Sequence, residues 1–358
     1  GSFGMAVSTA MIFGLVSLMF LDTSINMAMQ PFKMMVGDMV NEKQKGLAYS
    51  IQSFLCNAGS LVGFLFPFIF TWIGISNIAP QGVVPDSVIY SFYIGAAILI
   101  LCVIYTTVKV KEMPPAEYAE YHGITEEEEK EKINMVKLLI KAPKAFWTVG
   151  LVQFFCWFAF MFMWTYTNGS VAANVFDAPT VETAVNGVSK VMLDTKSIQY
   201  QDAADWVGVL FAVQAIGSVL WAVCIPLFKD RKLIYSLSLV LGGLGFISTY
   251  FVHNQYVLFI SFLLIGCAWA AMLALPFTIL TNALSGGHMG TYLGLFNGTI
   301  CIPQIVAASL GGSILALFTP KGMLPPEINM LVMAGVMLII GAVCVYLIKE
   351  TKGEQTKA

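Results

Sequence analysis

Nine long apolar segments run through this chain, and each could cross the hydrocarbon core of a membrane as a helix. A bilayer core about 30 Å thick needs about 20 apolar residues at 1.5 Å each. Hydrocarbon offers no partner for free backbone groups, so such segments must be helical. The sequence therefore predicts an all-α polytopic membrane protein with nine transmembrane helices. The segments cover residues 5–32, 46–74, 88–108, 145–168, 203–226, 233–252, 255–281, 289–313 and 328–348.

The composition supports a membrane protein and excludes several partners. The chain is 58% hydrophobic and 11% charged, with a mean hydropathy of +0.77, well outside the usage of soluble domains. A net charge of −2 gives no attraction for nucleic acid. The seven cysteines lie inside apolar stretches without metal-ligand spacing. We therefore expect the lipid bilayer and a small solute as partners, and no metal or cofactor.

The distribution of basic residues predicts how the chain is oriented in the membrane. Of the 19 Lys and Arg residues, 16 fall on one side of the predicted spans. Cytoplasmic loops are enriched in Lys and Arg, so that side should be cytoplasmic. We expect a multi-pass protein of the cell (inner) membrane, with residue 1 outside and the C-terminus inside. The side rich in basic residues holds Lys33, Lys43 and Lys45, the seven lysines from Lys109 to Lys144, Lys229, Arg231 and Lys232, and Lys349, Lys352 and Lys357.

A short internal repeat predicts the number of helices in the complete fold. The sequence Pro-Phe-Lys-Met-Met at 31–35 has a counterpart, Pro-Phe-Thr-Ile-Leu, at 276–280, and both close a span that starts outside. Internal repeats are characteristic of secondary transporters. The second copy lies in the fourth of the six spans after the long polar loop. By symmetry, three helices should precede Gly1, which gives twelve helices in two halves.

These features divide the chain into four parts. Residues 1–108 should form a partial N-terminal bundle that corresponds to helices four to six of the complete fold. Residues 109–143 are polar and should form a cytoplasmic linker. Residues 144–348 should form a C-terminal bundle of six helices. Residues 349–358 should be a cytoplasmic tail.

Asp22 is the one carboxylate that the pattern places near the middle of a membrane. If 5–32 is one helix, Asp22 lies about 16 Å along the axis from Lys33. Inserting an ionisable group there costs about 2.5–3.5 kcal/mol, which favours a functional role. Burial away from any cation would favour a carboxyl that holds its proton, as proton-coupled uptake requires. The alternative is a hydrogen-bonded Asp that only holds helices together.

Uncharged polar side chains and Trp residues form stripes along several spans. Amides beside indole rings suit sugars, which offer hydroxyls for hydrogen bonding and C–H faces for stacking. No Lys or Arg lies deep in a span, which disfavours an organic anion as ligand. The alternative is that the amides join helices and the Trp residues anchor interfaces. The candidate ligand-binding residues are Asn26 and Gln30 on the face of Asp22, Asn57, Gln153, Trp157, Trp164, Gln214, Trp269 and Asn297.

The first span carries a pattern that resembles a known family. Leu-Asp-Thr-Ser-Ile-Asn at 21–26, Gln-Pro-Phe-Lys at 30–33 and Gly-Asp at 37–38 are similar to the fourth helix of sucrose–proton symporters. These are glycoside–pentoside–hexuronide:cation symporters of the major facilitator superfamily, with bacterial sugar or maltose transporters as relatives. The resemblance covers essentially the whole chain, and by it we expect the first three helices of the family to be missing from this sequence. Further matching stretches lie at 90–95, 153–159, 205–211 and 290–297.

The resemblance implies a fold and roles for individual residues. The fold would be two six-helix bundles around a central cavity that opens alternately to each side. Asp22 would be the proton-coupling acid, and the spans with Asp22, Trp157 and Trp269 would line the cavity. The cytoplasmic gate would comprise Pro31, Lys33, Gly37 and Asp38.

The function predicted is secondary active transport: proton-coupled uptake of a neutral disaccharide or glycoside of the maltose or sucrose type. We expect a monomer that binds sugar and proton. One alternative is a sodium-coupled or uncoupled transporter of another solute, with oxygens from Asn26 and Asn57 beside Asp22. Another is a fragment that no longer transports. A membrane-embedded transferase is disfavoured because the three His residues are isolated, so no enzyme activity is expected.

Overall fold

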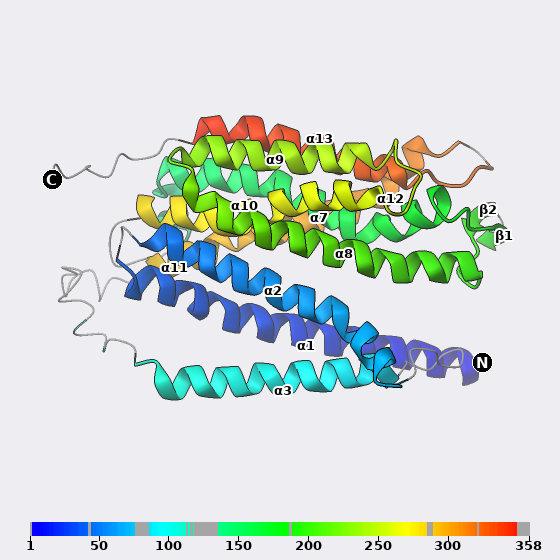
Figure 1. Ribbon diagram of the computed structural model, residues 1–358, viewed down its shortest axis with the longest axis horizontal. Coiled ribbons are helices and arrows are strands. Elements are labelled where there is room, and N and C mark those ends of the chain that lie inside the picture. The colour runs from blue at the N-terminus through cyan, green and yellow to red at the C-terminus, as the bar shows by residue number, and fades with distance from the viewer. Residues whose placement is uncertain are drawn as a thin grey trace.

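Long helices lie roughly along one common axis in the computed structural model of this protein (Figure 1). The structure describes residues 2–41, 44–75, 86–111, 114, 117, 135–185, 188–284, 289–320 and 322–348. A short antiparallel hairpin of β1 (Thr180–Val185) and β2 (Val188–Leu193) covers one end of the bundle. This end is called the hairpin end below.

Each of the nine predicted spans is helical. Eight helices of the described residues are long and apolar enough to cross a membrane, and α2, with 28 residues, also has the required length. The all-α membrane fold is thus confirmed, and the β1–β2 hairpin is an element that the apolar pattern did not predict. The helices are α1 (Ser2–Met39), α2 (Lys45–Trp72), α3 (Asp86–Lys109), α6 (Met135–Ile140), α7 (Lys144–Asn174), α8 (Ile198–Cys224), α9 (Arg231–Ser248), α10 (Leu258–Ala283), α11 (Met289–Phe296), α12 (Gly298–Phe318) and α13 (Ile328–Cys344), with short 3₁₀ turns η1 (Ile225–Leu227) and η2 (Val345–Leu347).

Local side-chain chemistry sets several helix starts. Asp230 caps α9: its Oδ1 accepts hydrogen bonds from the backbone N–H groups of Lys232 at 2.9 Å and Leu233 at 3.1 Å. Ser197 caps α8 by accepting from the N–H of Tyr200 at 3.3 Å. Such caps satisfy donors that the first helical turn leaves free. Polar residues between apolar runs therefore mark where α8 and α9 begin.

The two repeat prolines both lie inside helices. The first span was expected to end at residue 32, but α1 runs past Pro31 to Met39. In the same way α10 continues past Pro276 to Ala283. A membrane helix tolerates Pro because neighbouring groups can satisfy the freed backbone carbonyl. The end of the apolar run at residue 32 was therefore a wrong guide to the end of α1.

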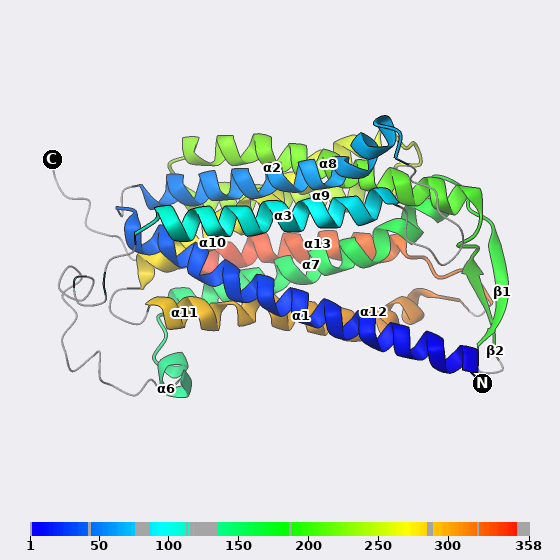
Figure 2. The same cartoon turned by 90° about the horizontal axis from the view of Figure 1, so that it is seen from below.

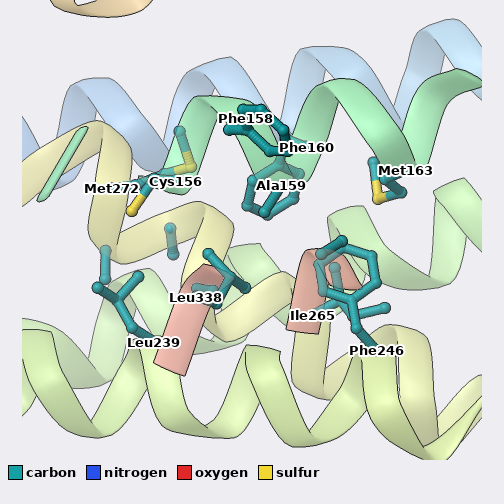
Figure 3. Packing of buried hydrophobic residues seen from close by; sticks show 14 of the residues in the cluster. Cys156, Phe158, Ala159, Phe160, Met163, Leu239, Phe246, Ile265, Met272 and Leu338 are labelled. Atoms are coloured by element: carbon teal, nitrogen blue, oxygen red, sulfur yellow. The ribbon is translucent and has the colours of Figure 1, made fainter. Parts of the chain in front are cut away.

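The hydrophobic core lies among the helices from α7 to α13. There α10 packs against α8 and α9, and α13 packs against α7 and α9. Figure 3 shows Phe160 of α7, Phe246 of α9, Ile265 of α10 and Leu338 of α13 directed into this core, and all four are fully buried. Interior packing of this kind fixes the faces that α7 and α10 present to each other.

Glycines bring two helix pairs into backbone contact. A Cβ built on Gly266 of α10 would lie 2.7 Å from the backbone N of Ser218 on α8. One built on Gly243 of α9 would lie 2.8 Å from the backbone O of Gly335 on α13. Small residues allow membrane helices to approach this closely, which gives extensive van der Waals packing. Any larger side chain at these crossings must push the helices apart.

Gly266→Ala should therefore destabilise the protein by about 1–3 kcal/mol, the usual cost of overpacking a core. The matched control is Gly208→Ala on α8, because a Cβ there would meet nothing within 4 Å. Thermal unfolding in detergent measures both variants. Equal melting temperatures for Gly266→Ala and the wild type would contradict the close crossing of α8 and α10.

The helices α1 and α3 are much less covered than the others. No residue is buried in the apolar segment of α1, and 6% of the residues are buried in that of α3, whereas 67% are buried in that of α10. Among the described residues, α2 makes the main connection of this part to the rest, through α8 and α10. The helix α3 lies at the edge of the bundle in Figure 1 and in front of the other helices in the view from below in Figure 2. The predicted linker at 109–143 falls mainly outside the described residues, so the division into four parts stays a prediction.

Candidate functional site

Three of the predicted Trp residues lie together in the bundle. Trp157 and Trp164 come from one face of α7, two turns apart, and Trp269 comes from the adjacent α10. The ring centroids of Trp269 lie 5.7 Å from those of both Trp157 and Trp164, nearly perpendicular in each case. The ring centroid of Phe160 lies 4.8 Å from that of Trp269, and Phe160 is fully buried, so it packs against Trp269 on the side of the core. We call Trp157, Trp164 and Trp269 the indole cluster.

Unpartnered polar atoms adjoin the indole cluster on α7. In the described part of the chain, the Nε1–H of Trp157 is buried without an acceptor. Gln153, one turn before it and 1% exposed, donates its Nε2–H to the backbone O of Met272 at 2.9 Å, and its Oε1 has no partner among the described residues. Buried polar groups are rarely left unpaired in proteins. A free donor and a free acceptor beside three aromatic rings are therefore suited to hold a polar ligand.

Asn57 places a further free acceptor on α2. It is fully buried, and its Nδ2–H donates to the backbone O of Ser53 at 2.7 Å, whereas its Oδ1 meets no partner within the described ranges. Ser53 in turn donates to the backbone O of Ala270 at 3.5 Å. Ala270 follows Trp269, so this face of α2 adjoins α10 at the level of the indole cluster.

Gln214 and Asn297 lie on other elements. Gln214 is 6% exposed, where α8 crosses α10. Asn297 interrupts the eighth span between α11 and α12, and its Oδ1 is unpartnered while its Nδ2 lies 3.9 Å from the Sγ of Cys301. Within the described part of the chain, neither makes a hydrogen bond to a Trp of the indole cluster.

Asp22 occupies a different environment from the one expected. Its side chain is exposed, so the expectation that this chain buries it is wrong. The physical reason is the weak packing of α1, which touches only α2 and α11 to a notable extent. Asp22 nevertheless lies within electrostatic range of Cys301 on α12, in the C-terminal half. Asn26 donates to the backbone O of Asp22 at 2.9 Å, so its amide N–H is used within α1.

The predicted gate falls largely outside what the structure describes. The backbone of α1 is described through Met39, but the side chains of Gln30, Lys33 and Asp38, and the surroundings of Gly37, lie outside the described residues. Pro31 lies inside α1 and is exposed. The gate therefore stays a prediction.

Phe160 and Glu327 also matter in this arrangement, although neither was among the candidate residues predicted from the sequence. Phe160 supports Trp269, and its position three residues after Trp157 on α7 was the available signal. Glu327, at the start of α13, lies against α7, and no pattern in the sequence indicated that contact.

The described helices form a multi-pass membrane protein whose buried polar groups offer a candidate site for a small solute. A family model described as the Major Facilitator Superfamily matches the chain over residues 1–188 and again over 171–358. The chain therefore belongs to the Major Facilitator Superfamily, and its function is secondary transport. The double match agrees with the internal repeat.

One solved structure illustrates the fold. The crystal structure of the E. coli fucose:proton symporter matches with a TM-score of 0.52 and 16% sequence identity, over 87% of this chain and 71% of that one. At this identity the likeness shows the fold alone. No curated protein gives a significant match.

Proposed function

We propose that this protein is a proton-coupled transporter of a neutral disaccharide or glycoside, in the sucrose–proton symporter branch of its superfamily. The observation that carries the proposal is the indole cluster with the free Oε1 of Gln153 and the free Nε1–H of Trp157 beside it. Indole faces stack on the C–H faces of sugar rings, and the free polar atoms can pair with sugar hydroxyls. The fucose:proton symporter is a fold relative of matching chemistry.

The charge of the site favours a neutral ligand over an organic acid. Within α7, α8, α10 and α12, Lys144 is the sole Lys or Arg, and it opens α7 at the end remote from the hairpin. A carboxylate or phosphate ligand would normally require a cation close by. The site offers amides and indoles instead, which is the complement of a polyol.

Asp22 is the proposed coupling acid. It is the only carboxylate among residues 12–29 of α1, and it lies within electrostatic range of Cys301 on α12 in the other half. Protonation there could therefore alter how the two halves meet. Sodium coupling is the alternative, with Asn57 contributing its free Oδ1. A cation such as sodium needs several oxygens that converge on one point, whereas a proton needs only the carboxylate of Asp22.

The weak packing of α1 and α3 supports a twelve-helix transporter. The repeat equates α1 with α10 and α3 with α13, and those helices pack against α7, α8 and α9. We propose that α1 and α3 pack in the working transporter against three equivalent helices. On this basis the hairpin end faces outward in the inner membrane, the C-terminus is cytoplasmic, and one monomer is the functional unit.

Uptake into proteoliposomes tests the proposed function. Vesicles with the natural full-length protein would receive radiolabelled maltose or sucrose under an imposed inward proton gradient, or under a sodium gradient. Accumulation that follows the proton gradient and collapses with a protonophore is expected. Accumulation under the sodium gradient alone would overturn the coupling, and failure to take up either sugar would overturn the substrate class.

A further inference from the structure

Glu327 is a carboxylate held between helices at the hairpin end. It immediately precedes α13, and its carboxylate lies against Gly169 of α7. A Cβ on Gly169 would lie 2.8 Å from Oε1 of Glu327 and still closer to Oε2. The carboxylate thus occupies space that any other residue at position 169 would fill.

A phenol joins a third helix to this arrangement. Tyr166, one turn before Gly169 and 8% exposed, interacts electrostatically with Glu327. A Cβ built on Gly311 of α12 would lie only 2.6 Å from the hydroxyl oxygen of Tyr166, which is too close for a real side chain. Two glycines therefore make room for one carboxylate and one phenol where α7, α12 and α13 meet. A small cavity begins beside them, between Ser170 and Ile328.

Among the described residues of the helices packed around it, Glu327 has no compensating positive charge. On α7 the titratable neighbour is Tyr166, and α12 carries no Asp, Glu, Lys, Arg or His. The helix α9 also packs against α13, but its Arg231 and Lys232 lie at its first turn, at the end of the bundle opposite to Glu327. Tyr250 follows the other end of α9 and is 49% exposed. Burial raises the pKa of Glu327 from 4.5 to about 7. The carboxyl therefore exchanges its proton near neutral pH.

We propose that Glu327 is a proton-binding site at the hairpin end, and that its protonation controls how tightly α7 packs against α12 and α13. A neutral carboxyl suits the uncharged junction, whereas the anion must be solvated and pulls the helices apart. The small cavity beside the junction is lined by Ser170 of α7 and Ile328 of α13, so a change in this packing alters the end of the bundle next to the hairpin. This inference goes beyond the proposed function, since it involves neither Asp22 nor the identity of the solute.

Backbone hydrogen exchange of the natural protein in lipid nanodiscs tests the proposal. Wild type and Glu327→Gln would be compared at pH 5.5 and pH 8.5, so that intrinsic exchange rates cancel at each pH. At pH 8.5, peptides that span Gly169 should exchange roughly tenfold faster in the wild type than in Glu327→Gln, and at pH 5.5 the two proteins should exchange equally. Glu327→Gln should remain protected at both values. The matched control is Asp177→Asn, an exposed carboxylate of the same end at φ 48°, which Asn tolerates.

Two results would overturn the proposal. One is the same pH response in Glu327→Gln as in the wild type, and the other is no pH response in the wild type. A second measurement covers a variant that fails to fold: infrared titration of the carboxylic C=O band in Asp22→Asn. A band that titrates near pH 7 in this variant supports Glu327, and its absence refutes the site. Because Asp22 is removed, this result is separate from the success or failure of the proposed symport.

Discussion

Asp22→Asn is expected to abolish proton-driven accumulation of sugar while leaving exchange of internal for external sugar intact. The amide keeps the shape and hydrogen-bonding capacity of the side chain but cannot take up and release a proton. Without that step the proton gradient is no longer linked to sugar movement, whereas the binding site on α7 and α10 is unchanged. At a potential of 100 mV one proton contributes about 2.3 kcal/mol, which corresponds to an accumulation of roughly 50-fold. That whole factor should be lost.

Paired uptake and counterflow assays in proteoliposomes measure the two activities separately. The matched control is Asp86→Asn, an exposed carboxylate in the first turn of α3, which should behave as the wild type. If Asp22→Asn still concentrates sugar against its gradient, then Asp22 is a structural residue and the coupling acid lies elsewhere. Loss of both accumulation and exchange would point to a defect in folding or binding instead.

The spans were predictable because apolar length alone decides whether a segment crosses a membrane. Their ends were less predictable, since they depend on local and tertiary contacts. The end of α8 and the start of α9 follow from the polar turn around Asp230, which caps α9. In contrast, α1 continues past Pro31, and the eighth span breaks at Asn297, although neither change alters the apolar pattern.

The candidate site was predictable only where one helix face carries it. Trp157 and Trp164 are seven residues apart, so helical periodicity places them on one side of α7. Trp269 joins them because α7 packs against α10, which periodicity does not reveal and which family resemblance suggested. The exposure of Asp22 was mispredicted because burial depends on neighbouring helices. Glu327 approaches Gly169 across more than 150 residues of chain, a contact that only tertiary packing creates.

Trp157→Phe should weaken sugar transport and at the same time preserve or improve stability. Phe keeps an aromatic ring in the indole cluster but removes the Nε1–H, which is buried and has no partner among the residues that the structure describes. If that donor serves a sugar hydroxyl, its loss costs about 1–2 kcal/mol, so KM should rise roughly fivefold to thirtyfold with kcat nearly unchanged. Without sugar, the variant no longer buries an unsatisfied donor, so its melting temperature should be equal or higher.

The opposite directions of these two effects separate a ligand-binding role from a structural one. Uptake kinetics and thermal unfolding would be measured on the same preparations, with Trp147→Phe as control. Trp147 lies on the same helix but is 52% exposed and away from the indole cluster, so its replacement should change neither quantity by much. A lower melting temperature with unchanged KM would show that the indole of Trp157 serves packing. A raised KM in a protein of undiminished stability would instead require the ligand to be the missing partner of its N–H group.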